Sequence, residues 1–311
     1  MSRQALVQLR FLKPLEKYKR EKPYWLFVGK PDGADVTNVS LEAVSGIPIH
    51  DVRGEERNYE LDEHGFKFFS HNLDFEDFHD DQRIEREYLP QVEKMMLEKI
   101  PSANKVFVFN WRLRKEMGEE QMDHPISPAQ IHDTNFVFAP SQTVHSDSTE
   151  FTLLKRVKKH LPEEADLLLQ GRVQMINFWR PICHEVGNWP LVLCDGRSTP
   201  LKNLVAVDQI SRRFVGDLYY ATYDPGYRWH YLSSMGVGEG VLFKCWDTGN
   251  KAPSKGMYAR HTVYPSKYAH VWKVCLHSSC DMPKEMLPKV YHPRLSIECR
   301  ALVFSAAEDS T

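Results

Sequence analysis

The sequence predicts an α+β protein whose second half forms an antiparallel, double-sheet jelly roll. The chain has 311 residues, of which 42% are hydrophobic, so it can bury a full core. Helical periodicity is concentrated before residue 170. From residue 172 onward, short aromatic and β-branched runs are separated by Gly, Pro, Asn and Asp, which is typical of antiparallel sheets. Because the helices precede most of the strands, α+β is the expected class.

Residues 1–134 predict a β-rich and helical cap that packs on the core. From Arg83 to Ile100, apolar residues recur at helical spacing, and Pro90 either divides or starts that helix. The polar stretch Lys115–His132 contains two prolines and predicts a loop. Strands are expected at apolar runs broken by turn residues, namely Tyr24–Val28, Ile47–Ile49, Phe66–Phe69 and Val106–Trp111.

Residues 135–305 predict the jelly-roll core, residues 306–311 a flexible tail, and cap and core together one integrated domain. Asn135–Asp147 is expected to be extended, Thr149–His160 to be a helix with a basic face, and Glu163–Leu169 to be helical. The core strands are expected at Val173–Trp179, Leu191–Cys194, Asp217–Tyr223, Trp229–Leu232, Val241–Trp246, Thr262–Tyr264, Val271–Leu276 and Leu295–Phe304.

Composition and charge narrow the classes of partner. With 40 basic and 42 acidic side chains, the net charge is -2, which does not favour binding to nucleic acid. No apolar run has the length of a membrane span. The six cysteines occur singly, as in a reducing compartment, and the N-terminus has no continuous apolar segment typical of export signals. We therefore expect a cytoplasmic protein that acts on a small molecule, and a homo-oligomer is compatible with this sequence.

One short motif predicts a metal site. His145 and Asp147 are two positions apart in an extended segment, so both side chains point to the same face. A second histidine from a distant strand would complete a 2-His-1-carboxylate triad, which leaves open positions on iron for a cosubstrate and for O2. His261, which begins an apolar strand, is the candidate. A hydrogen-bonded turn and a structural histidine are the alternatives for these residues.

Other histidines are expected to have no such role. His79 and Asp81 repeat the same spacing, but they precede a helix, where a solvated first turn explains them. The remaining candidates, for which the sequence suggests no partner, are interpreted as surface or packing residues: His184, His230, His270, His277 and His292.

The last predicted strand carries an unusual polar face. Arg294, Ser296, Glu298 and Arg300 alternate with apolar residues, so the four polar side chains share one side of the strand. An exposed ion-pair ladder would explain this face if it lies in water. If it faces the interior of the fold, the arginines require an anionic partner, since an unpaired buried charge is very costly.

Together, His145-x-Asp147, the distal His261 and Arg294-x-Ser296 resemble the Fe(II)/2-oxoglutarate-dependent oxygenases. The resemblance narrows to their hydroxylase/desaturase group, which includes fungal gibberellin desaturase-like and cephem methoxylase-like enzymes of natural-product pathways. It extends from about residue 45 to 305 and is carried by segments such as Asn177–Ile182, Trp189–Asp195, Leu242–Thr248 and Arg294–Arg300.

The resemblance implies a double-stranded β-helix, a cupin-like jelly roll with flanking helices, that binds Fe(II), 2-oxoglutarate and O2. His145, Asp147 and His261 are the implied iron ligands, and Arg294 with Ser296 the implied cosubstrate site. Many family members place this arginine soon after the distal histidine, whereas 33 positions separate the two here. Further candidates for cosubstrate binding are therefore Arg300, Arg180 and Asn177, with an ion pair, packing or a strand hydrogen bond as their alternatives.

The implied reaction is hydroxylation or desaturation of an unactivated C–H position in a small apolar or polycyclic natural product. The first alternative is a cupin-like metal-dependent hydrolase or isomerase that uses no 2-oxoglutarate. The second is a jelly-roll partner protein without catalytic activity. Five aromatic residues are candidates for lining the substrate pocket, although core packing explains them equally well: Phe136, Phe138, Tyr227, Trp229 and Tyr231.

Overall fold

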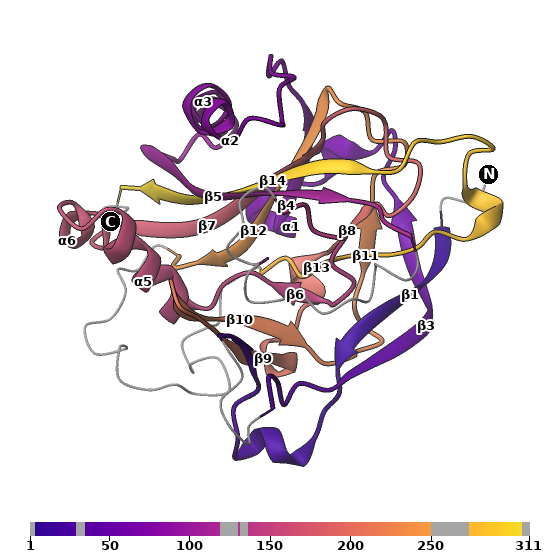
Figure 1. Cartoon of the computed structure of the whole chain (residues 1–311), viewed down its shortest axis with the longest axis horizontal. Coiled ribbons are helices and arrows are strands. Elements are labelled where there is room, and N and C mark those ends of the chain that lie inside the picture. The colour runs from indigo at the N-terminus through magenta and orange to yellow at the C-terminus, as the bar shows by residue number, and fades with distance from the viewer. Residues whose placement is uncertain (1–3, 29–34, 119–129, 131–135, 250–273, 307–311) are drawn as a thin grey trace.

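Two β-sheets packed face to face make up the core of the fold (Figure 1). The computed structural model describes residues 4–28, 35–118, 130, 136–249 and 274–306. Within these residues, the first sheet has the strand order β1-β3-β11-β8-β13-β6-β10-β9-β2, and the second the order β4-β12-β7-β14-β5. This architecture confirms the predicted α+β jelly roll.

The strand bounds are as follows. The first sheet consists of β1 (Gln4–Leu12), β2 (Tyr24–Phe27), β3 (Leu41–Asp51), β6 (His145–Ser146), β8 (Leu191–Cys194), β9 (Leu204–Ser211), β10 (Val215–Ala221), β11 (Trp229–Tyr231) and β13 (His277–Ser279). The second sheet consists of β4 (Phe66–Ser70), β5 (Lys105–Lys115), β7 (Arg172–Pro181), β12 (Glu239–Asp247) and β14 (Leu295–Ser305).

Helices cover one sheet and close one end of the sandwich. The α-helices are α1 (Leu61–His64), α2 (Asp81–Arg83), α3 (Leu89–Lys99), α5 (Glu150–His160) and α6 (Ala165–Leu168), and a π-helical turn, η3 (Ile84–Tyr88), joins α2 to α3. Short 3-10 helices are η1 (Glu16–Lys19), η2 (Glu56–Asn58), η5 (Gly196–Ser198), η6 (Leu201–Asn203) and η8 (Lys284–Met286). In the described residues, no helix is long and apolar enough to cross a bilayer.

The predicted helices agree with the observed ones. Pro90 stands in the first turn of α3, directly after the π-helical turn η3, so it divides a continuous helical segment where the hydrogen-bonding pattern changes. Helix α5 begins after Thr149, whose hydroxyl accepts a hydrogen bond from the backbone N–H of Thr152. The His79-x-Asp81 motif spans the N-cap of α2. The side chain of the N-cap residue, Asp80, accepts hydrogen bonds from two backbone N–H groups of that helix. This agrees with the interpretation of His79 and Asp81 as part of a helix start.

The N-terminal strands pair within the two sheets of the jelly roll. Strand β3 pairs with β1 on one side and, in parallel, with β11 on the other, while β5 pairs with β14. Strands β1 and β9 lie outside the predicted strands. In β1, Ala5, Val7, Leu9 and Phe11 alternate with more exposed residues, so the basic N-terminal segment nevertheless buries one face.

Two hydrophobic clusters lie on opposite faces of the second sheet. The inner cluster fills the space between the sheets, and the outer one packs β7, β12 and β14 beneath α3, which Figure 1 shows over that sheet. Strand β14 separates them by simple alternation: Ile297 and Cys299 belong to the outer cluster, whereas Ser296 and Glu298 are buried on the inner face. An exposed ion-pair ladder is therefore excluded for this strand.

All six cysteines are free thiols.

Candidate metal centre

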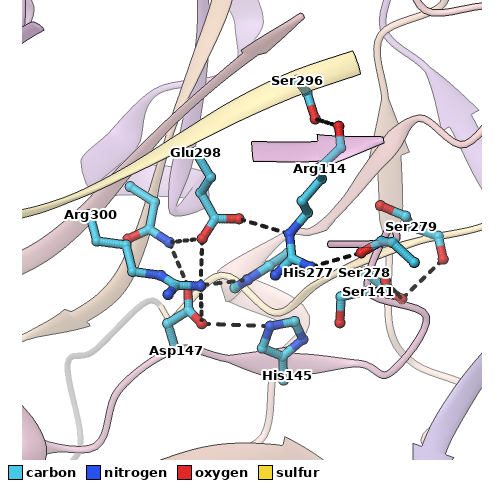
Figure 2. Close-up of polar contacts among 12 residues, drawn as sticks. Arg114, Ser141, His145, Asp147, His277, Ser278, Ser279, Ser296, Glu298 and Arg300 are labelled. Atoms are coloured by element: carbon cyan, nitrogen blue, oxygen red, sulfur yellow. Dashed lines mark hydrogen bonds and ion pairs between the residues drawn. The ribbon is translucent and has the colours of Figure 1, made fainter. Parts of the chain in front are cut away.

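Three side chains converge between the sheets. The Nε2 atom of His145 lies 3.6 Å from Oδ1 of Asp147, and the Nε2 atom of His277 lies 3.7 Å from Oδ2 of the same carboxylate. One ligand atom from each residue lies within 4.8 Å of the others. Figure 2 shows His145 and Asp147 facing each other with His277 beside them. The residues described thus contain a complete 2-His-1-carboxylate set.

Strand pairing brings the two histidines together. His277 in β13 is the direct partner of His145 in β6, and the centroids of their rings are 4.2 Å apart. Side chains of directly paired residues point to the same face of a sheet, so both imidazoles enter the interior. Asp147 follows β6 and returns to that face two positions after His145.

Both imidazoles have the same orientation. The Nδ1 atom of His145 lies 2.7 Å from the carbonyl oxygen of Thr143, and that of His277 lies 3.4 Å from the carbonyl oxygen of Cys275. When Nδ1–H donates to a carbonyl, Nε2 keeps its lone pair, and both Nε2 atoms face Asp147. The Nε2 atom of His277 is buried without a hydrogen-bond partner, as expected for an atom oriented toward a metal ion.

The protonation states also suit a divalent metal. Burial, followed by the charge of His145, lowers the pKa of His277 to about 3, and burial likewise lowers the pKa of His145. Burial alone would raise the pKa of Asp147, but Arg300 and then the two histidines outweigh it and hold the pKa well below its usual value. Two neutral imidazoles and one carboxylate are the forms that bind a metal ion. The residues therefore fit Fe(II).

Polar residues of the second sheet hold Asp147 in place. Asn177 Nδ2 donates to Oδ2 of Asp147 at 2.6 Å. Arg300 donates to both carboxylate oxygens, through Nε at 3.1 Å and Nη2 at 3.2 Å, and also pairs with Glu298 at 2.7 Å. Figure 2 shows Arg300 and Glu298 directed toward Asp147. Arg300 is therefore engaged by carboxylates of the chain itself.

A small pocket adjoins the two histidines. Arg294 lies in its wall and is only 2% exposed. Its Nη1 donates to the carbonyl oxygen of Trp189 at 2.5 Å and to Oγ of Ser279 at 3.0 Å. The cavity lining includes Arg114, Ser141, His145, Trp179, His277, Ser279, Arg294 and Glu298.

Among the residues that the structure describes, Arg294 has no anionic hydrogen-bond partner. Its Nε and Nη2 atoms are buried and make no hydrogen bond. Burial, followed by the nearby charge of Arg114, lowers its pKa to about 9. A buried guanidinium with two unsatisfied donors is costly unless an anion binds there, and Nε with Nη2 is one of the edges that match a carboxylate. The wall of the cavity thus offers a site for a carboxylate.

Other predicted cosubstrate residues lie elsewhere. The Oγ of Ser296 is buried 3.5 Å from the carbonyl oxygen of Arg114 and is not part of the cavity lining. Asn177 contacts Asp147, as described above. Arg180 points to the opposite face of β7, where its guanidinium lies 5.5 Å from the rings of both Phe78 and Tyr88. The structure therefore does not bring Arg180 to the cluster.

The distal histidines differ from expectation. His261 and the strand predicted at Thr262–Tyr264 lie outside the described residues, as does His270. His277 was expected to be a surface or packing residue, but it is 2% exposed and belongs to the candidate metal-binding cluster. One local signal could have identified it: Cys275, His277 and Ser279 alternate at the end of an apolar run.

The remaining candidates take packing positions. The rings of His184 and His292 stack on each other at 4.0 Å. Tyr227 and Trp229 pack around Phe11 in the inner cluster, to which Tyr231 also belongs, in agreement with the packing interpretation. Phe136 and Phe138 contact each other edge to face.

Comparisons with known proteins place the chain in a family. The family model described as "Oxidoreductase/YMDC permease-like domain" matches residues 9–304. The Fe(II)/2-oxoglutarate-dependent dioxygenase nvfI of Aspergillus novofumigatus is 25% identical over 83% of this chain and 82% of its own length. Hydroxylase/desaturase poxK of Penicillium oxalicum is 24% identical over 93% and 89%, and hydroxylase/desaturase CTB9 of Cercospora beticola is 29% identical over 71% and 70%.

A solved structure shows the same fold. The iron and alpha-ketoglutarate-dependent endoperoxidase NvfI superposes with a TM-score of 0.76 at 24% identity, covering 97% of this chain and 98% of that protein. The predicted resemblance to Fe(II)/2-oxoglutarate-dependent oxygenases and hydroxylase/desaturases is thereby confirmed. The chain belongs to the oxidoreductase/YMDC permease-like family, and its relatives include fungal Fe(II)/2-oxoglutarate-dependent dioxygenases.

Proposed function

We propose that this chain is an Fe(II)/2-oxoglutarate-dependent oxygenase that binds iron through His145, Asp147 and His277. It hydroxylates or desaturates an unactivated C–H position of a small secondary metabolite. The observation that carries the proposal is the convergence of these three side chains beside a cavity in whose wall Arg294 is buried and unpaired. His277 takes the position in this proposal that the sequence suggested for His261.

Each residue has a defined task in this proposal. When bound, Fe(II) and 2-oxoglutarate would activate O2, which is the oxidant: the cosubstrate would give up two electrons as it becomes succinate and CO2, and the substrate the other two. His145 and His277 present their Nε2 lone pairs, which the Nδ1 contacts to backbone carbonyls keep oriented. The two sheets surround the cluster with apolar residues and exclude bulk water from the reacting groups.

Arg294 is proposed to bind the distal carboxylate of 2-oxoglutarate. Trp189 and Ser279 occupy Nη1, so the guanidinium plane is fixed while Nε and Nη2 remain available. A bidentate, charge-assisted pair with a carboxylate would satisfy both donors. In this arrangement Ser279, rather than the predicted Ser296, is the serine beside the carboxylate.

Arg300 is proposed to position Asp147 rather than the cosubstrate. Its two bonds to the carboxylate and its ion pair with Glu298 leave Asp147 little freedom to rotate. Asn177 adds a third hydrogen bond to the same carboxylate. Substitution of a residue that orients a metal ligand in this way typically lowers metal affinity by about 10–100-fold.

We further propose a cytoplasmic enzyme with an apolar or polycyclic substrate, acting without nucleic acid or membrane. The division into a cap of residues 1–134, a core of residues 135–305 and a tail belongs to the same proposal, with cap and core folding as one unit. The relatives named hydroxylase/desaturase support the reaction type and the small-molecule substrate.

Anaerobic spectroscopy tests the proposal. Addition of Fe(II) and 2-oxoglutarate under argon should produce a weak visible charge-transfer band, and exposure to air should then yield succinate. A metal-dependent hydrolase or isomerase and a non-catalytic partner protein both predict no such band. Absence of the band in folded protein that binds Fe(II) would reject the oxygenase assignment.

A further inference from the structure

Arg114 lies in the wall of the same small pocket as Arg294. It is the direct partner of Ser296 between β5 and β14, and the backbone N–H of Glu116 donates to the carbonyl oxygen of Arg294 at 2.8 Å. Arg114 and Arg294 are therefore diagonal neighbours across the two strands, and long side chains at such positions can reach one another. Leu295, between Arg294 and Ser296, packs on the outer cluster, so both arginine side chains lie on the inner face.

Glu298 satisfies Arg114 only in part. The Nη1 atom of Arg114 donates to the carbonyl oxygen of Ala139 at 2.9 Å, but its Nε lies 4.0 Å from Oε2 of Glu298, beyond hydrogen-bond distance (Figure 2). Arg300 already pairs with the other oxygen of Glu298 at 2.7 Å and donates to both oxygens of Asp147. Among the residues that the structure describes, no carboxylate accepts a hydrogen bond from Arg114.

The two guanidinium groups in the pocket wall repel each other. Burial, followed by the charge of Arg114, lowers the pKa of Arg294 to about 9. Burial is also the main cause that lowers the pKa of Arg114. Two desolvated cations in one pocket wall are costly unless an anion lies beside them. An anion that contacts both side chains would offset their repulsion.

One carboxylate can serve both arginines. Its two oxygens offer about four lone-pair directions, so it can accept a bidentate pair from Arg294 and a further hydrogen bond from Arg114. Glu298 is the acidic residue in the described lining of the pocket, and its pairing with Arg300 reduces its repulsion of an incoming carboxylate. The two arginines and a single carboxylate therefore complement each other in charge and in hydrogen bonding.

We propose that Arg114 is a second cosubstrate arginine, which binds the distal carboxylate of 2-oxoglutarate together with Arg294. This inference rests on the proposed oxygenase function and deepens it, because it adds a specificity-determining residue to the same site. Contacts with the carbonyl oxygens of Ala139 and Trp189 hold the two guanidinium groups in place. Arg114 thus contributes to the selection of 2-oxoglutarate over 2-oxo acids that lack the distal carboxylate.

Two matched 2-oxo acids test this role. Fe(II)-loaded protein is titrated calorimetrically under argon with 2-oxoglutarate and with 2-oxopentanoate, in which a methyl group replaces the distal carboxylate. The ratio of the two dissociation constants measures the preference for the carboxylate. Arg114→Gln, which keeps a donor for the carbonyl oxygen of Ala139, should reduce this preference about tenfold or more, because a charge-assisted hydrogen bond is lost. The affinities for 2-oxopentanoate and for Fe(II) should not change.

Three further variants complete the comparison. Arg114→Met also removes the charge and should reduce the preference as Arg114→Gln does. Arg114→Lys keeps the charge but lacks the planar fork of donors, so it should reduce the preference less than the neutral variants do. Arg112→Gln is the matched control, because Arg112 lies two positions away on the same face of β5 and outside the described lining of the pocket. It should leave the preference unchanged.

Three results would each overturn the role of Arg114. The first is an unchanged preference in any folded variant at position 114. The second is an equal loss of affinity for both 2-oxo acids, which a merely structural role predicts. The third is an equal reduction in Arg112→Gln, which would indicate a general effect of charge rather than contact. In all three cases the oxygenase assignment stands if the unaltered protein forms the charge-transfer band; absence of that band in the unaltered protein overturns both.

Discussion

At the residue scale, two arginines of the candidate site differ in their hydrogen-bond and ion-pair partners. Arg300 is satisfied by Asp147 and Glu298, whereas Arg294 keeps two donors without a partner. In our proposal, the same residue type at six positions' distance therefore orients the metal ligand in one case and binds the cosubstrate in the other. Sequence alternation places both on one face but does not show which is paired.

Substitution of the third ligand tests the metal centre. His277→Ala should abolish high-affinity Fe(II) binding and the anaerobic band, because one of three ligands is lost. His145→Ala and Asp147→Ala should behave alike. His261→Ala serves as the matched comparison and should retain Fe(II) affinity, measured by competition with a chromogenic chelator. The reverse result, loss in His261→Ala and retention in His277→Ala, would reject our ligand assignment.

The two arginines predict opposite phenotypes. Arg294→Leu should weaken 2-oxoglutarate binding about tenfold or more and leave Fe(II) affinity intact, since only the carboxylate loses its pair. Arg300→Leu should instead weaken Fe(II) binding by about 10–100-fold, because Asp147 loses its orientation. Separate titrations with Fe(II) alone and with 2-oxoglutarate at saturating Fe(II) distinguish these effects. Exchange of the two phenotypes would show that Arg300 binds the cosubstrate.

At the element scale, the two candidate histidine ligands lie in two very short strands of the first sheet. Strand β6 has two residues and β13 three, and the pairing of His145 with His277 joins them. The local pattern His145-x-Asp147 and the polar face of β14 were predictable, because strand alternation is a property of neighbouring residues. The pairing of His145 with His277 was not, since register between distant segments depends on the whole sheet.

The start of α5 supports the adjacent strand. Thr149 caps the helix and, like Thr152, donates a hydrogen bond to Asp217 of β10. Thr149→Ala should lower the free energy of unfolding by about 1–3 kcal/mol, because it removes the cap and a donor to a buried carboxylate. Urea unfolding measures this loss. Thr199→Ala, in a loop outside α5, is a suitable comparison, and an equal loss there would contradict the proposed role of the cap.

At the scale of the whole molecule, the interior keeps several histidines neutral. Burial is the main cause that lowers the pKa of His71, His160 and His230 to about 4 each. Their pKa in the unfolded chain is about 6.5, so below that pH the unfolded state binds more protons than the folded state. Stability should therefore fall as the pH decreases from about 6.5 toward 4.

Urea midpoints across this range test the acid sensitivity. His71→Gln combined with His230→Gln should flatten the decline, because two of the titrating groups are removed. A midpoint that stays constant between pH 6.5 and 4 in the unaltered protein would show that these histidines titrate alike in both states.

The α+β class was predictable because the composition, the helical spacing of apolar residues and the turn residues between apolar runs all indicated it. The full sheet topology was not, and β1 illustrates why. Its segment alternates buried and exposed residues, yet Arg and Lys nearby give it the appearance of a solvated terminus. The alternation buries one face of the segment because β1 pairs with β3 at the edge of the first sheet, and this pairing is not visible in the local sequence.

The contacts of both ligand imidazoles with main-chain carbonyls have a wider consequence. Thr143 and Cys275 hold the rings through atoms that every amino acid possesses, so exchange of those two side chains alters nothing that the rings contact there. The orientation of both rings should therefore tolerate replacement of either side chain, because each contact is made to the main chain. The sequence can vary at these two positions while the geometry of the proposed ligands stays the same.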